Sequence, residues 1–370
     1  MPPVPDDSQQ PTPHADGTAI VARAREMGFA LAGITGAEPS EFPRELAAWL
    51  GNGKHAGMGW LAENTELRLD PRAMVPGATS VLLVADVYAH AAGDAPPGGS
   101  GRVAKYARGD DYHRVMKAKL HELADELRES HPDHQFRAFV DTAPVLEREH
   151  ASRAGLGWTG KHTLLINPDF GSYFALGGII TTLPLSIPEE QIARWLPVRG
   201  TPETGHCGTC TRCIDACPTD AITPWSVDAS RCISYLTIEH REPIDESFWA
   251  AIGDNLYGCD ICQDVCPHNA EPSVAPIRSE YTPRHNSFDL LGVLGWTEDD
   301  RRAAFTRSAM KRAKLPMMKR NAIICATNAI AQDPTASDGL RERIGALASD
   351  AHEKSIVRET ARAALGILGA

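Results

Sequence analysis

The chain has 370 residues, of which 42% are hydrophobic, and a mean hydropathy of -0.27. This length predicts two or three domains, and no apolar run reaches the roughly 18 residues that a membrane span needs, so we expect a soluble, cytoplasmic protein. The formal net charge of -11 argues against nucleic-acid binding by the chain as a whole, because binding to phosphates needs a basic face.

The first third of the chain predicts a disordered leader followed by helices and a buried strand. Residues 1–17 are polar, proline-rich and without periodicity, as in disordered segments. A helix is predicted over 19–27, and the nearly continuous apolar run over 80–88 predicts a buried strand. Apolar residues at helical spacing predict an amphipathic helix over 114–129.

Strands and helices continue to alternate toward the middle of the chain. The next predicted elements are a strand, a helix and two more strands, over residues 136–140, about 143–154, 163–166 and 173–183. The alternation predicts an α/β or α+β domain over residues 18–200. Asp141 follows a strand, where sheets often present functional groups to a crevice. An aspartate before a helix can equally be an N-cap, so both interpretations stay open.

A glycine motif in this region matches the dinucleotide-binding pattern GxGxxG at Gly155, Gly157 and Gly160. That fingerprint needs a strand before it and a helix after it. Here a predicted helix precedes the glycines and a predicted strand follows them. We therefore interpret them as positions where the backbone turns sharply or approaches another group closely, and not as an NAD or flavin site.

Eight of the nine cysteines fall between residues 207 and 266. Their spacing is Cys207-x2-Cys210-x2-Cys213-x3-Cys217-Pro218, a single Cys232, and Cys259-x2-Cys262-x3-Cys266-Pro267. In bacterial ferredoxins with such spacing, three thiolates hold one [4Fe–4S] cluster and the fourth crosses to the other. This predicts cluster one on Cys207, Cys210, Cys213 and Cys266, and cluster two on Cys217, Cys232, Cys259 and Cys262.

Two other uses of these cysteines fit less well. Structural zinc sites take four thiolates, but neither the x3 spacing nor the prolines are expected of them. A disulfide framework needs an oxidising compartment, and the N-terminal stretch lacks the order of a secretory signal. We therefore predict a ferredoxin-like domain with two clusters over residues 201–275. Cys325 stands apart in an apolar helical stretch and is predicted to be a core residue.

The remaining residues, 276–370, predict a helical domain. Three helical segments over 310–332, 336–349 and 354–368 resemble a short HEAT-like solenoid, although three helices can equally form a small bundle. From residue 301 to 332 the chain has no acidic residue and eight basic ones: Arg301, Arg302, Arg307, Lys311, Arg312, Lys314, Lys319 and Arg320. We predict a polyanion-binding face here, against the alternative of an ordinary solvated helix face.

Long motifs are spread over about residues 50–330. They are Tyr106–His113, Val140–Arg148, Gly155–His162, Cys207–Pro218, Arg231–Glu239 and Tyr257–Pro267, with Arg72, Pro76 and Gly77. In this order they resemble the epoxyqueuosine reductase family. The eight candidate cluster ligands and Asp141 all match the family's pattern.

The resemblance implies a cobalamin-dependent enzyme with two [4Fe–4S] clusters. Such an enzyme converts epoxyqueuosine at the wobble position of tRNA into queuosine and removes the epoxide oxygen as water. The resemblance also implies that electrons pass from a donor through the clusters to the cobalt, and that Asp141 donates a proton to the departing oxygen. A carboxyl group can do this near neutral pH only if burial against the apolar corrin raises its pKa.

The resemblance and the positions in the chain also suggest contacts. The candidates for cobalamin are Asp141, Leu165, Leu176, Ser234 and Asp260, and those for the tRNA backbone are Lys311, Arg312, Lys314, Lys319 and Arg320. We expect a monomer with an N-terminal cobalamin-binding domain. Two other function classes remain open: a different corrinoid and iron–sulfur reductase, such as a reductive dehalogenase, and a non-enzymatic electron carrier.

Overall fold

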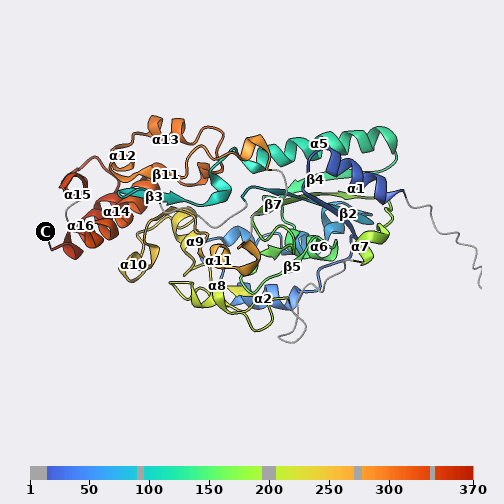
Figure 1. Ribbon diagram of the computed structural model, residues 1–370, viewed down its shortest axis with the longest axis horizontal. Helices are drawn as coiled ribbons and strands as arrows, with labels where there is room; N and C mark the ends of the chain where they lie inside the picture. Colours follow the sequence, from blue (N-terminus) through green and yellow to red (C-terminus); the bar gives the residue numbers. More distant parts are fainter. Residues whose placement is uncertain (1–14, 90–95, 194–205, 271–276, 334–337, 370) are drawn as a thin grey trace, which may run out of the picture.

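The computed structural model describes residues 15–89, 96–193, 206–270, 277–333 and 338–369. Most of the predicted leader, residues 1–14, lies outside these ranges. Figure 1 shows the main sheet toward one end of the long axis and helices α12–α16 toward the other, with the cysteine-rich segment between them. Within the described residues, no helix is both long and apolar enough to cross a membrane.

The four-stranded sheet has the order β1 (Leu31–Gly36), β2 (Ser80–Val87), β7 (Phe174–Thr181) and β4 (Phe136–Val140). The apolar runs that predicted β2, β4 and β7 therefore do form strands, and every residue of β2 is buried. All neighbouring strands are antiparallel. The first part of the chain is thus α+β, and the crevice argument for Asp141, which applies to parallel sheets, does not apply here.

Helices cover both faces of this sheet. On one face α1 (Gly17–Glu26) and α5 (Tyr112–Ser130) bury their apolar sides against the strands. On the other face lies α6 (Glu147–Arg153), which is shorter than predicted. Figure 1 shows α5 and α6 on opposite sides of the sheet. The remaining elements of this part are α2 (Pro43–Gly51), η1 (Gly59–Leu61), α3 (Thr65–Leu69), α4 (Pro71–Met74), β5 (Trp158–Thr159), β6 (Leu165–Ile166) and α7 (Glu189–Ala193).

The glycine motif lies between α6 and the small hairpin of β5 and β6. A Cβ atom on Gly157 would lie 2.2 Å from the carbonyl oxygen of Ile166, so no larger residue fits there without a shift of the backbone. The motif therefore follows a helix and allows a close backbone approach, as the sequence predicted.

The cysteine-rich segment consists of short elements. They are α8 (Arg212–Asp215), β8 (Ile222–Thr223), β9 (Ser226–Val227), α9 (Ile233–Ile238), η3 (Glu246–Phe248), α10 (Trp249–Ile252), β10 (Asn255–Tyr257), α11 (Ile261–Asp264) and η4 (Pro267–Asn269). Strand β10 pairs with β3 (Ser100–Val103), which also pairs with β11 (Ser287–Asp289). This second sheet joins strands from all three predicted domains. Between β3 and α5 lies η2 (Lys105–Ala107).

The last part of the chain is helical. It contains η5 (Ser279–Tyr281), α12 (Leu290–Gly295), α13 (Glu298–Ala304), η6 (Ala309–Arg312), α14 (Leu315–Gln332), α15 (Asp338–Ser349) and α16 (Ser355–Ile367). Helix α14 packs against α16, α12 and β10 and is buried on nearly all sides. Cys325 lies in this core with 2% of its surface exposed, as predicted.

Candidate active site

The eight clustered cysteines form two groups of four. Cys207, Cys210, Cys213 and Cys266 line one pocket, together with Lys161 and His162. The Nζ atom of Lys161 donates hydrogen bonds to the carbonyl oxygens of Gly208 and Cys210, at 2.8 and 2.9 Å, which tie the cysteine loop to the first part of the chain. Burial and the nearby thiols raise the pKa of Cys213 to about 11.

The second group contains Cys217, Cys232, Cys259 and Cys262. Burial raises the pKa of Cys259 to about 12, and Cys232 and Cys217 add to the effect. Burial also raises the pKa of Cys262 well above its ordinary value, and Cys259 and Cys232 contribute. All nine cysteines are described, and all are free thiols. Cys217 and Cys266 therefore each lie with the cysteines of the opposite motif.

Asp141 directly follows β4 and forms a hydrogen-bonded group with α5. The Tyr112 hydroxyl donates to Oδ2 of Asp141, and Nε2 of His113 lies 2.9 Å from Oδ1. On its other side, Nδ1 of His113 lies 2.7 Å from Oδ1 of Asp111. Helix α6 starts at Glu147 with Leu146 at its N-cap, so the N-cap interpretation of Asp141 is wrong.

The charges around Asp141 favour a protonated histidine. Burial lowers the pKa of His113, but Asp111 and Asp141 outweigh this effect and raise the pKa to about 9. Burial, with the charge of Asp141, raises the pKa of Tyr112 well above its ordinary value. Burial also raises the pKa of Glu147, and the positive charge of Arg148 partly offsets this increase. Asp141 thus contacts two groups that hold a proton at neutral pH.

Tyr112 and His113 were not among the predicted site residues. They occur in the motif Tyr106–His113, which carried the resemblance but had no assigned role. Spacing along the chain could not reveal them, because Tyr112 and Asp141 are 29 residues apart and meet only when the start of α5 packs beside the end of β4. The N-cap of α5, Asp111, accepts a hydrogen bond from the backbone of His113 and so helps to fix the start of this helix.

The structure places the predicted cobalamin contacts in different surroundings. Leu165 and Leu176 lie in the apolar core between the sheet and α6, with 2% and 8% of their surfaces exposed. Asp260 is buried and accepts a hydrogen bond of 2.8 Å from the backbone of Lys105. Ser234 is half-buried on α9. Only the two leucines share one apolar cluster.

Buried polar groups lie between Asp141 and the second cysteine group. Tyr88 is close enough to Tyr112 to affect its pKa. Burial raises the pKa of Tyr88, and the nearby Asp260 and Cys262 raise it further. The Nζ atom of Lys105 lies 2.5 Å from Asp264, which also accepts a hydrogen bond from Tyr173. Tyr88 thus lies near Tyr112, the partner of Asp141, and also near Asp260 and Cys262.

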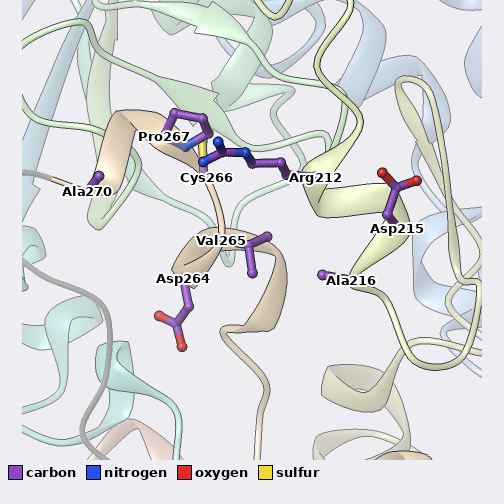
Figure 2. A pocket seen from close by; sticks show the side chains of 8 residues that line it. All are labelled: Arg212, Asp215, Ala216, Asp264, Val265, Cys266, Pro267 and Ala270. Atoms are coloured by element: carbon purple, nitrogen blue, oxygen red, sulfur yellow. The ribbon is translucent and has the colours of Figure 1, made fainter.

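The pocket drawn in Figure 2 has a volume of about 550 Å³ and lies between α8 and α11. Figure 2 shows Arg212 extending from α8 toward Cys266 and Pro267. Neither Asp141 nor its two partners line this pocket. It opens beside the first cysteine group and is separate from the candidate active site.

The structure corrects the prediction of a basic face that includes Lys319 and Arg320. Their exposed fractions are 7% and 0%. Lys319 pairs with Glu353 at 2.6 Å, and Arg320 donates to the carbonyl oxygens of Leu236, His240 and Glu242, each at 2.7 Å. Both side chains therefore hold the fold together, and neither is free to contact a phosphate.

Acidic residues of α13 itself and of other segments neutralise much of the basic run. The pairs are Arg301–Glu298, Arg302–Asp299, Arg307–Asp110 and Arg312–Glu239. Lys311 and Lys314 are exposed, and within the described residues no ion pair is found for either. The exposed part of the predicted face is thus smaller than the sequence suggested.

Comparison with known proteins identifies two family matches. The family described as "4Fe-4S double cluster binding domain" matches residues 206–269, and "Epoxyqueuosine reductase QueG, DUF1730" matches residues 68–142. An epoxyqueuosine reductase from Leadbetterella byssophila is 42% identical over 310 residues, which are 82% of this chain and 95% of the relative.

Solved structures agree with these matches. An epoxyqueuosine reductase bound to an epoxyqueuosine-modified tRNA-Tyr stem loop has a TM-score of 0.83 at 28% identity. The match covers 95% of this chain and 90% of that one. An epoxyqueuosine reductase from Bacillus subtilis, whose aspartate-bearing catalytic loop is swung out of the active site, has a TM-score of 0.82 at 27% identity, with the same two coverages.

Proposed function

The chain belongs to the epoxyqueuosine reductase family, and we propose that it reduces epoxyqueuosine in tRNA to queuosine. The observation that carries this proposal is the group of Asp141, Tyr112 and His113, in a fold that also gathers eight cysteines into two groups of four. The reaction consumes two electrons and two protons, because the epoxide oxygen leaves as water and a carbon–carbon double bond forms.

We propose that each group of four cysteines holds one [4Fe–4S] cluster, with Cys217 and Cys266 crossing between the motifs. Such a cluster needs four thiolates, and each group supplies four free thiols. Raised thiol pKa values fit this use, because bound iron compensates the charge of thiolates that burial otherwise disfavours. The clusters would supply the electrons one at a time.

The residues between Asp141 and the second cysteine group also fit cobalamin. Leu165 and Leu176 are packed in the apolar core between the sheet and α6, so they could support such a site only from behind. The hydroxyl of Tyr88 and the carboxylate of Asp260 could bind its amide groups. When bound, cobalamin would supply a strongly reducing or nucleophilic cobalt.

We propose that Asp141 delivers protons to the departing epoxide oxygen and that His113 replenishes them. His113 lies within hydrogen-bond distance of Asp141, and its raised pKa keeps it protonated at neutral pH. Tyr112 holds the other carboxylate oxygen and so fixes the direction in which Asp141 points. The B. subtilis relative, whose aspartate-bearing catalytic loop is swung out of its active site, supports a catalytic role for an aspartate.

The test is the variant Asp141→Asn, which keeps the shape of the side chain but removes its transferable proton. Turnover of tRNA carrying epoxyqueuosine, measured anaerobically by mass with a strong reductant and cobalamin, should fall by about 10²-fold or more. Iron content should not change. The matched control is Asp133→Asn, an exposed aspartate in the turn before β4, which should retain full activity.

The outcomes separate the remaining functions. Full activity of Asp141→Asn would exclude it as the proton donor. If the unmodified protein binds eight irons, about four for each cluster, but converts no epoxyqueuosine, a different reductase or an electron carrier would fit better.

A further inference from the structure

An exposed tryptophan lies close to two arginines that come from distant parts of the sequence. Trp60, in η1, has 41% of its surface exposed and is the only aromatic among the large exposed apolar residues of the described ranges. The guanidinium carbon of Arg68 lies 5.6 Å from the ring centroid, and that of Arg312 lies 5.5 Å from it. Both distances are typical of cation–π contacts.

Separate contacts orient the two arginines. Arg68 donates a hydrogen bond of 3.4 Å to the carbonyl oxygen of Trp60, and burial lowers its pKa. The Nε atom of Arg68 is buried and has no partner among the described residues. Arg312 pairs with Glu239, at 2.6 Å. Both guanidinium groups therefore lie near the ring, while 41% of the surface of Trp60 remains exposed.

The tryptophan lies near both the proposed active site and the exposed lysines. The carboxylate of Glu147 is close enough to Arg68 and Asp141 that both affect its pKa. Arg312 follows Lys311 directly in η6 and precedes Lys314 by two residues. The two arginines that contact Trp60 therefore also neighbour Glu147, beside the proposed active site, and the exposed lysines.

We propose that Trp60, with Arg68 and Arg312, is a stacking site for an unpaired nucleobase of the tRNA anticodon loop. Proteins bind single-stranded RNA by stacking bases on aromatic rings and guanidinium planes. Arg68 and the exposed Lys311 and Lys314 supply positive charge that attracts the neighbouring phosphates. This inference rests on the proposed function and adds a contact to a nucleotide other than the one that reacts.

The test compares Trp60→Leu, which stays apolar but cannot stack, with Trp60→Phe, which can. Binding of an anticodon stem-loop RNA is measured at several salt concentrations. Trp60→Leu should weaken binding about tenfold to a hundredfold, with an unchanged salt slope, and Trp60→Phe should restore most of the affinity. The control is Leu291→Ala, an exposed apolar residue with 44% exposure on α12, which should have no effect.

A second measurement identifies the base and does not need a variant protein. Stem loops in which each loop nucleotide in turn is abasic are bound to the unmodified protein. One abasic position should reproduce the loss seen for Trp60→Leu, and combining the two should add nothing.

The proposal is overturned if Trp60→Leu binds all stem loops normally, or if no abasic position reduces affinity. It is also overturned if Trp60→Phe is as weak as Trp60→Leu while both keep their iron, because the ring would then serve only the fold. Turnover by the unmodified protein tests the proposed function independently of these results.

Discussion

At the scale of single residues, His113 determines the charge of the proposed active site. It is held between two carboxylates, Asp111 and Asp141, at 2.7 and 2.9 Å. Without them, burial would favour the neutral imidazole. The pair of carboxylates instead keeps a positive charge beside Asp141, which suits a site where negative charge develops on an epoxide oxygen.

The raised pKa of His113 predicts a specific pH dependence of stability. A group whose pKa rises on folding stabilises the protein fully below its unfolded pKa, and this contribution is lost as the pH rises through the folded value. With values of 6.5 and about 9, the loss should occur between about pH 6.5 and 9 and amount to on the order of 3 kcal/mol. Urea unfolding of His113→Asn should lack this loss.

The comparison variant is His121→Asn, on an exposed position of the same helix. This variant shows how much of the pH dependence comes from other groups such as the cysteines, which also lose protons in alkaline solution. If His121→Asn and His113→Asn show the same pH profile, His113 does not carry the predicted charge.

At the scale of elements, Arg320 attaches α14 to the cysteine-rich segment. The helix is surrounded by other elements, so its polar side chains need partners inside the protein. Arg320 is fully buried and donates to three carbonyl oxygens at and after α9, and Asn321 donates to the carbonyl oxygens of Thr237 and Leu256. These bonds join α14 to the cysteine-rich segment.

Removing this attachment should destabilise the protein without changing how it binds RNA. Arg320→Ala leaves three carbonyl groups without their donor and should lower the free energy of unfolding by about 3 kcal/mol or more. The exposed Arg302→Ala should change it by less than about 0.5 kcal/mol. A lower salt slope of tRNA binding in folded Arg320→Ala would instead indicate a phosphate contact.

Helices α8 and α11 each precede a cysteine that lies with the opposite group. Cys217→Ser should therefore damage mainly the cluster of Cys232, Cys259 and Cys262, and Cys266→Ser mainly the other one. Iron analysis and EPR spectra of the reduced proteins measure this. Cys325→Ser, in the core of α14, is the control and should keep both clusters. An unchanged spectrum in either ligand variant would disprove the crossed assignment.

At the scale of the whole molecule, the features that could be predicted are those that a local sequence pattern determines. The apolar run over 80–88 identified β2, and the cysteine spacing identified two groups of four. The antiparallel order of the sheet could not be predicted, because β2 and β7 are paired across almost a hundred residues. For the same reason, the partners of Asp141 were missed.

The exposed positive charge of the basic run was overestimated for a related physical reason. Charge along the chain does not show which acidic residues the fold brings close. Asp110, Glu239 and Glu353 come from distant segments and neutralise Arg307, Arg312 and Lys319. Only knowledge of the packing could show that the unpaired positive charge is concentrated at Lys311 and Lys314.

These two lysines allow a test of how the whole protein holds tRNA. If both contact phosphates, Lys311→Ala with Lys314→Ala should lower the salt slope of tRNA binding by about two, regardless of the anticodon sequence. The KM for tRNA should rise, while iron content and turnover at saturating tRNA should stay the same. The control is Lys117→Ala with Lys119→Ala on α5, away from η6 along the chain. If the two double variants have equal slopes, the tRNA backbone is bound by another surface, and Lys311 and Lys314 belong to an ordinary solvated face.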